Sequence, residues 1–276
     1  MKNKIIYIMI LICVVVIGSG CNNSNLQENN EKNINQSSED SKEHDNNEDS
    51  IANDTSENKG KSKKEEVVSI NKTIVIDPGH SSTGTSGQEP IAPESSQTKL
   101  KDGLGATGEY TGVPEHKTNM SVALLVKENL ESKGYNVVMT KSDVAESKSN
   151  IERAFIGNEN NADLVLRIHA DSSENNNIGG ASVHVPGNNK YTSSIYEISK
   201  SYGETIINTY AQELGIKNRG VIERDDLTGF NWSKVPVVLI EMGFLSNKED
   251  DMFVSNTENH SKIAKVIADG IYKCFE

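Results

Sequence analysis

Short apolar runs recur along the chain from residue 73 onward, and polar segments with helical periodicity separate them. The runs are rich in Val, Ile and Leu, and runs of this length are typical of strands buried on both faces of a parallel sheet. Strands are predicted at 73–76, 135–140, 164–168, 181–185 and 237–241. Because ligands bind at the carboxyl ends of the strands in such sheets, the residues that follow these runs are the first candidates for a functional site.

Four further segments have the apolar spacing of amphipathic helices. They are 117–133, 151–160, 193–214 and 261–275. In the first, one apolar face is formed by Val122, Leu125, Val126 and Leu130, and Gly134 is a natural C-terminal stop. The alternation of strands and helices predicts a single α/β domain, in which a mostly parallel twisted sheet has helices on both faces.

The segment 81–114 is rich in Gly, Ser, Thr and Pro and is long for a connection. A loop of this length in a compact domain is usually functional or disordered. We expect a loop that borders the cleft at the strand ends, and the sequence leaves open whether it acts as an inhibitory lid.

The N-terminus has the layout of an export signal. Two lysines precede an apolar run at 5–17 that is short for a membrane span, and small residues then lead into Cys21. This layout resembles the bacterial lipoprotein signal, although Gly18 stands where that pattern has Leu, Val or Ile. The sequence predicts a signal peptide over 1–20 and lipidation of Cys21, with ordinary secretion or an uncleaved anchor as alternatives.

A polar tether is predicted over 21–70. Residues 22–66 include 12 acidic and six basic side chains and no aromatic one, so this part cannot bury enough apolar surface to offset chain entropy. The folded domain is therefore expected over 71–276. Its acidic character, within a chain of net charge −12, argues against nucleic acid as a partner. Cys274 has no disulfide partner within that domain, which must rely on its own core or on a metal.

Residues that can bind a metal, or assist one, lie at the ends of three predicted strands. His80 and His169 each follow a buried strand, Glu241 ends another, and Glu115 stands at the edge of the first long helix. A hydrolytic zinc site needs three His or carboxylate ligands, an open position for water and a general base. The two histidines with Glu115 are an allowed ligand set, and desolvation at the end of an apolar strand would suit Glu241 to the role of base.

Several assignments around this set stay open at the level of sequence. The spacing does not separate Glu115 from Glu94 or Glu109 as the third ligand. Asp77 and Asp171 are expected to orient the ligand imidazoles, as carboxylates beside metal-binding histidines often do. Solvated or half-exposed positions are expected for Glu89, Glu94, Glu109, His184 and His260.

Four ordered stretches resemble the zinc-dependent N-acetylmuramoyl-L-alanine amidases of the type-3 amidase family, which cut the bond that joins glycan to peptide in bacterial cell walls. The stretches are VIDPGH at 75–80, PEHKTNMSVALLVKENLESKGYNVVMTK at 114–141, NIERAFIGNENNADLVLRIHADS at 150–172 and PVVLIEMGFLSNKED at 236–250. Two positions depart from the family pattern: Ser81 replaces a usual Gly, and Lys141 replaces a frequent Arg.

The resemblance implies that His80, Glu115 and His169 bind one Zn²⁺ ion and that Glu241 is the catalytic glutamate. It also implies a zinc amidase-like fold and hydrolysis of the amide bond between N-acetylmuramic acid and L-alanine, by a water that zinc and Glu241 activate. Arg153 matches a family position on a helix, and we interpret it as structural support in preference to a substrate contact.

Two alternative functions remain at this stage, namely another zinc hydrolase of wall peptides, such as a carboxypeptidase, and a non-catalytic cell-wall-binding lipoprotein. The expected partners are peptidoglycan and a membrane reached through the lipid anchor, with no nucleic acid. We expect a monomer outside the cytoplasm, either membrane-anchored or secreted to the cell wall. Peptide-stem preference, cross-link preference and the stage of use are not specified by the sequence.

Overall fold

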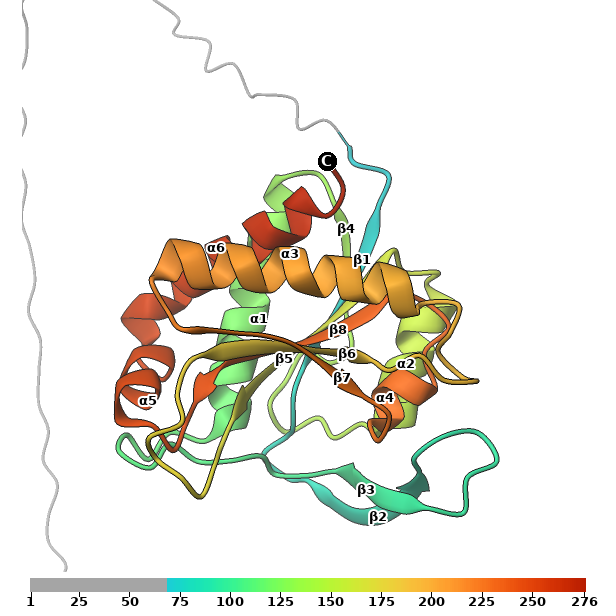
Figure 1. Cartoon of the computed structure of the whole chain (residues 1–276), viewed down its shortest axis with the longest axis horizontal. Coiled ribbons are helices and arrows are strands. Elements are labelled where there is room, and N and C mark those ends of the chain that lie inside the picture. The colour runs from blue at the N-terminus through green and yellow to red at the C-terminus, as the bar shows by residue number, and fades with distance from the viewer. Residues whose placement is uncertain (1–68) are drawn as a thin grey trace, which may run out of the picture. The chain divides into compact units, whose positions relative to one another are not determined.

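The computed structural model describes residues 69–276; the predicted signal peptide, Cys21 and nearly all of the predicted tether lie outside this range. A six-stranded sheet forms the centre (Figure 1). In spatial order its strands are β4 (Asn136–Met139), β1 (Thr73–Pro78), β5 (Leu164–Asp171), β8 (Val237–Phe244), β6 (Ala181–Pro186) and β7 (Asn218–Arg224). Every neighbouring pair is parallel except β6 with β8, which confirms the prediction of a mostly parallel sheet.

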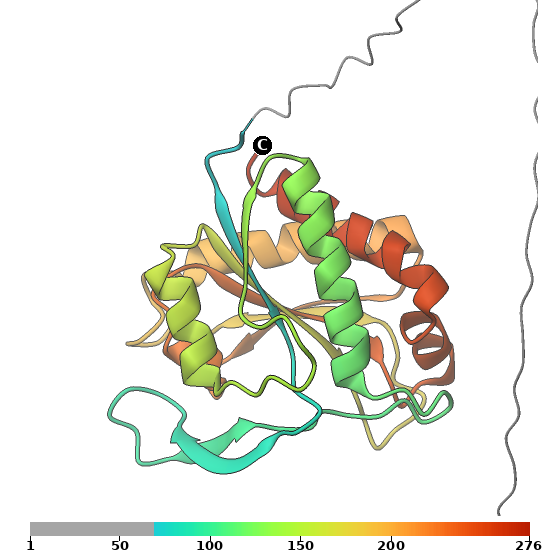
Figure 2. The same ribbon diagram turned by 180° about the vertical axis from the view of Figure 1, so that it is seen from behind.

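Helices cover both faces of the sheet, as Figures 1 and 2 show from opposite sides. On one face, α1, α3 and α6 pack together, and on the other α2 packs with α4. Their bounds are α1 (Glu115–Ser132), α2 (Asn150–Glu159), α3 (Tyr196–Leu214), α4 (Thr228–Asn231), α5 (Lys248–Val254) and α6 (Thr257–Lys273). The α/β class and the two-sided arrangement of the helices are confirmed.

The strands explain this arrangement, because successive side chains point to opposite faces. In β1, Ile74 and Ile76 belong to the larger core under α1, α3 and α6, whereas Val75 belongs to the smaller core beside α2 and α4. Each of the eight residues of β8 is buried. The apolar runs of the sequence therefore correspond to strands that are covered on both sides, and their ends converge on one edge.

The expected long loop at 81–114 is in part a β-hairpin, which corrects the sequence prediction. Its strands β2 (Thr85–Pro90) and β3 (Thr98–Asp102) form a separate antiparallel pair at the end of the molecule opposite α3 (Figure 1). Most side chains of both strands are polar, and six of the eleven residues are exposed. Such strands lack the apolar alternation by which a strand is found in a sequence.

Three expectations of solvent exposure are also corrected. Glu89 is buried, and its carboxylate accepts hydrogen bonds from the backbone N–H groups of Asn150 and Ile151 at the first turn of α2. His260 is buried between Ser121 and the carbonyl of Val254, and His184 is buried on β6. The contacts of Glu89 with α2 and of His260 with Ser121 join segments that are far apart in the sequence, so local composition gave no sign of them.

Cys274 lies partly buried against the larger core and is the free cysteine of the described range. Its Sγ atom lies 3.2 Å from the carbonyl oxygen of Gly270. None of the helices in residues 69–276 is both long enough and apolar enough to cross a membrane.

Candidate metal centre and catalytic cleft

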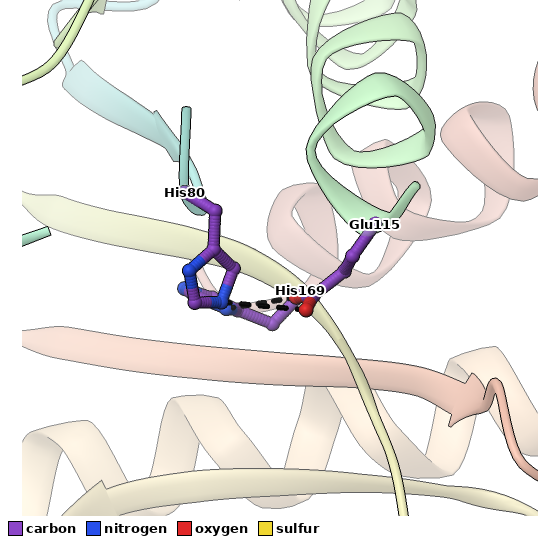
Figure 3. Close-up of side chains that lie close together, drawn as sticks. All are labelled: His80, Glu115 and His169. Carbon is purple, nitrogen blue, oxygen red and sulfur yellow. Dashed lines mark hydrogen bonds and ion pairs between the residues drawn. The ribbon is translucent and has the colours of Figure 1, made fainter. Parts of the chain in front are cut away.

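Three predicted ligands meet where the strands end. His80 follows β1, His169 lies near the C-terminal end of β5, and Glu115 is the first residue of α1 (Figure 3). Each offers one ligand atom, and these three atoms lie within 4.8 Å of one another. The two imidazole rings are edge to face, with centroids 4.9 Å apart. Among residues 69–276, this is the group of His, Cys, Asp and Glu side chains whose geometry suits a metal ion.

The backbone of His80 is held in an uncommon conformation. Its φ of 62° lies in the left-handed region, which costs a non-glycine residue roughly 1–2 kcal/mol. Buried Lys141 donates a hydrogen bond to the carbonyl oxygen of His80. On the ring, Nδ1 donates to the carbonyl oxygen of Gly103 over 2.9 Å. His80 is thus held by Gly103, which follows the hairpin strand β3, and by Lys141, which follows β4.

Glu115 is the most strongly held member of the set. Its carboxylate accepts hydrogen bonds from the backbone N–H of Ala106 (2.8 Å) and of Ala170 (3.2 Å), and from the side-chain amide of Asn119 (3.0 Å). Burial opposes its ionisation, but the two histidines outweigh that effect and hold the pKa of Glu115 well below its usual range. The carboxylate is therefore an ionised acceptor with a fixed position.

The atoms of His80 and Glu115 that face each other suit a cation between them. A carbonyl can only accept, so Nδ1 of His80 carries a proton, and in the neutral form of the ring Nε2 presents a lone pair. Burial lowers the pKa of His80, but the hydrogen bond and the charge of Glu115 outweigh burial and raise it. That lone pair faces Oε2 of Glu115, another acceptor, 3.3 Å away. Two acceptors at this distance need a proton or a metal ion between them. A backbone carbonyl on the outer nitrogen is also the usual support of a metal-binding histidine.

His169 completes the set from the other side of Glu115. Its Nδ1 lies 3.2 Å from Oε1 of Glu115, and its Nε2 is buried without a hydrogen-bond partner among the described residues. Burial is the main cause that lowers the pKa of His169 to about 4, so the ring is neutral near pH 7. Neutral imidazole is the form that binds metals.

Glu241 lies on β8, paired with His169 on the neighbouring β5. Burial, and then the charges of Glu115 and Asp171, raise the pKa of Glu241 well above its usual range. Its Oε2 atom has no hydrogen-bond partner within the described part of the chain. A buried carboxyl group with an unpaired oxygen and a raised pKa has the properties of a general acid–base.

A cavity of about 310 Å³ lies beside this group of residues. His80, His169 and Glu241 line it together with cationic side chains from β3, α2, β5 and β7. The hairpin contributes Lys99, Leu100 and Asp102, so the segment 81–114 borders the cleft as predicted, although it does so as a hairpin.

Asp77 serves a different purpose from the one predicted. Its buried carboxylate binds Nη1 of Arg153 and Nε of Arg167, each at 2.8 Å, and accepts a hydrogen bond from Thr140. It therefore holds two guanidinium groups, where the sequence had suggested that it would orient an imidazole; Gly103 orients His80 instead. Burial raises the pKa of Asp77, but the charges of Arg153 and Arg167 outweigh that effect and hold the pKa far below the usual range.

Arg153 is almost fully buried and bridges Asp77 to Asp102. It also donates to the carbonyl oxygen of Pro78, two residues before His80. These contacts agree with the interpretation of Arg153 as structural support for the first ligand. Asp102 accepts in addition from Ser81, one of the two residues that depart from the family pattern.

The remaining candidates lie apart from the centre. Asp171 accepts a hydrogen bond from the backbone N–H of Ser172, and within residues 69–276 its carboxylate has no hydrogen bond to His169, so the predicted orienting contact is corrected. Glu94 and Glu109 are exposed, and Glu109 bonds to Asn176. The structure thus selects Glu115 from the three glutamates that spacing left open. Its signal in the sequence was its position at a helix start, whereas Gly103 and Lys141 had no such signal.

Comparison with known proteins places these features in a family. A family model described as N-acetylmuramoyl-L-alanine amidase matches residues 74–273. The probable cell wall amidase LytH of Staphylococcus aureus is 28% identical over 200 residues, which are 72% of this chain and 57% of LytH. The chain therefore spans a little over half of the length of LytH.

Solved structures agree with the family match. The amidase Ami1 of Mycobacterium abscessus has a TM-score of 0.68 and 27% identity, with 76% of this chain and 100% of that one covered. AmiC2 of Nostoc punctiforme has a TM-score of 0.58 and 26% identity, with coverage of 75% and 98%. The chain has the α/β fold of these amidase structures. The chain belongs to the type-3 N-acetylmuramoyl-L-alanine amidase family.

Proposed function

We propose that this protein is a zinc-dependent enzyme that hydrolyses the amide bond between N-acetylmuramic acid and L-alanine in bacterial peptidoglycan. One observation carries the proposal: His80, Glu115 and His169 lie together as a possible metal site, beside a cavity that His80, His169 and the buried Glu241 line. The membership of the chain in the amidase family identifies the bond that such a centre would cut.

His80, Glu115 and His169 would hold the zinc ion. Two neutral imidazoles and one carboxylate are a ligand set of catalytic zinc sites, in which a fourth position stays open. When bound, zinc supplies Lewis acidity, which lowers the pKa of water toward ~7 and polarises a carbonyl group. Lys141 and Gly103 hold His80, and hydrogen bonds from Ala106, Asn119 and Ala170 hold the carboxylate of Glu115, which supports a site whose ligands are already positioned for an ion.

Glu241 would move the proton in this reaction. Its carboxylate takes a proton from the attacking water as that water adds to the carbonyl carbon of the lactyl group. It then passes the same proton to the nitrogen of the departing alanine. A raised pKa suits both steps, since the group must accept a proton and release it near neutral pH. The reaction needs no covalent bond to the protein.

We further propose that the protein acts outside the cytoplasm as a monomer, with a lipid on Cys21 and a tether over 21–70 that carries the catalytic domain. The supporting observation is the lipoprotein-like layout of residues 1–21. The similar protein LytH is a probable cell wall amidase, which agrees with a location outside the cytoplasm.

Analysis of digestion products tests the function. Purified peptidoglycan is incubated with the zinc-loaded protein, and the products are separated and identified by mass spectrometry. The proposal expects intact muramic acid lactyl groups and peptides with a new N-terminal alanine. Release of a C-terminal amino acid would instead identify a carboxypeptidase. Binding of peptidoglycan without any cleavage would identify a non-catalytic wall-binding protein.

A further inference from the structure

His184 is a buried group of the cleft that the proposed reaction does not use. It lies on β6, is 6% exposed and lines the cavity that contains Glu241. Its Nδ1 atom lies 3.4 Å from Nη1 of Arg224. A guanidinium group can only donate, so Nδ1 accepts and the ring proton sits on Nε2. The Arg224 contact therefore fixes the tautomer of His184.

The Nε2–H group of His184 has no acceptor among the described residues. A buried donor without a partner costs about 1–3 kcal/mol, and such groups are rare in folded proteins. His184 itself lines the catalytic cavity. Its natural partner is an oxygen atom of a molecule that enters the cavity.

Lys99 borders the same cavity from the hairpin strand β3. Its ammonium group donates to the backbone carbonyl of Asp226 over 3.2 Å, and within residues 69–276 it forms no ion pair with a carboxylate. An ammonium has three N–H donors, so two are available. Burial and the charges of Arg167 and Arg224 lower the pKa of Lys99, and an anion beside it would relieve that effect.

Two carboxylates line the cavity, Asp102 and Glu241, and the proposed reaction uses Glu241 as its acid–base. Asp102 accepts from Ser81, Ser147 and Arg153. Asp226, beside the cavity, receives both the Nε and the Nη2 donors of Arg224. Among residues 69–276, no carboxylate forms an ion pair with Lys99 and no acceptor lies within hydrogen-bond distance of Nε2 of His184, although Arg167 and Arg224 lie near Lys99 and Arg224 lies near His184. A carboxylate fits this set of donors better than a neutral carbonyl oxygen, because it accepts more hydrogen bonds and offsets the positive charge.

We propose that His184 and Lys99 form a binding site for a free carboxylate on the peptide part of the substrate. The proposal deepens the proposed function, on which it rests, because it assigns a peptide-side specificity to the same cleft. Arg224 is a positioning residue for His184, and the hairpin places Lys99 against the peptide. The site would favour stem peptides whose second residue keeps its carboxylate over peptides in which that group is an amide.

Two dipeptides that differ in this group alone provide the test. L-alanyl-D-glutamate with its γ-carboxyl group blocked as a methylamide, and the α-amide of the same compound, are titrated calorimetrically into the full zinc-loaded chain. The wild-type protein is expected to bind the acid at least about tenfold more tightly than the amide, and the difference should shrink at high salt as screening weakens the charge pair. Equal affinity for the two dipeptides would overturn the proposal.

Three variants separate this site from general effects. Lys99→Met removes a partly exposed charge and should abolish most of the preference for the acid, while binding of the amide changes less than about twofold. His184→Phe keeps a flat ring and removes the donor, and it should also reduce the preference. Lys101→Met, at an exposed position two residues further along β3, is the matched control and should retain the preference. A preference unaffected by Lys99→Met would contradict the proposal even if His184→Phe does not fold.

Dipeptide binding and wall hydrolysis are read separately. Cleavage of the muramoyl–alanine bond without discrimination between the dipeptides would refute the carboxylate site and leave the proposed function standing. Discrimination without any cleavage of peptidoglycan would refute the proposed function and leave the binding site standing. Equal loss of activity toward acid and amide substrates in His184→Phe would assign His184 to the reacting carbonyl group instead, which also overturns the proposal.

Discussion

Gly79 lies directly against the imidazole of His169. A Cβ atom on Gly79 would be 2.5 Å from both ring nitrogens, which is closer than real Cβ atoms approach other heavy atoms. The glycine of the VIDPGH stretch therefore makes room for a metal ligand on the neighbouring strand. The contact predicts that a single methyl group at this position is enough to displace His169.

We accordingly expect Gly79→Ala to lower zinc affinity and to reduce activity at least about tenfold, because a metal site depends on ligand positions within about 0.5 Å. Zinc affinity is measured by competition with a chelating dye. Gly103→Ala is the control, since a Cβ atom there would meet its nearest neighbour, Nδ1 of His80, at an ordinary 3.8 Å. Equal zinc affinity in Gly79→Ala and the wild type would disprove this account of the glycine.

Glu241→Gln should separate metal binding from proton transfer. Gln keeps the size of the side chain but cannot accept the proton, so activity should fall by about 10²–10⁴-fold. Zinc content, measured by elemental analysis, should stay at one ion per chain because Glu241 is not among the three ligands. Wild-type hydrolysis by this variant would refute the role of Glu241 as the base.

Removal of the metal should abolish activity and lower the midpoint of thermal unfolding. A ligand that binds only the folded state adds about 2.7 kcal/mol of stability at 100 times its Kd. Unfolding is followed by calorimetry before and after chelation and again after zinc is restored. His80→Ala provides the comparison, and zinc should leave its midpoint unchanged. Full activity in protein shown to be free of metal would be incompatible with the zinc assignment.

Asp77→Asn should destabilise the protein in a pH-dependent manner. Loss of the charge leaves Arg153 and Arg167 without their buried partner, at a cost of about 3–5 kcal/mol near pH 7. Because the folded-state pKa of Asp77 lies below the unfolded value of about 3.9, its contribution is complete above that pH and is lost as the pH falls further. The difference between variant and wild type should therefore narrow in acid.

Urea unfolding at several pH values from 7 down to 3 measures this effect. Glu131→Gln is the control, because the exposed Lys127–Glu131 pair within α1 should contribute at most about 0.5 kcal/mol. A large destabilisation by Asp77→Asn that does not change with pH would point to altered packing in place of the lost charge.

Much of the fold followed from the sequence because its central strands are buried on both faces and so appear as continuous apolar runs. The same logic placed His80, His169 and Glu241 at the strand ends. The hairpin β2–β3 was not predicted, since its strands are polar and pair only with each other. Strand β7, with the sequence NRGVIER, is a mostly polar edge strand and was missed for a related reason.

The support of the site depended on contacts that no local pattern encodes. Lys141 reaches the carbonyl of His80 from the end of β4, and Asp77 binds guanidinium groups from two other elements. Likewise, Glu89 looks like a solvated loop charge in the sequence but is buried at the start of α2. Burial of such charges is decided by partners that folding brings together, and a single sequence does not specify them.

The most direct test of the central claim is a crystal structure of the zinc-loaded protein with diffraction data collected on both sides of the zinc absorption edge. The account predicts one anomalous peak within coordination distance, about 2.0–2.2 Å, of atoms from His80, Glu115 and His169, with the carboxyl group of Glu241 nearby but not bound to it. A peak bound to other residues, or no peak in protein that contains one zinc ion per chain, would contradict the account.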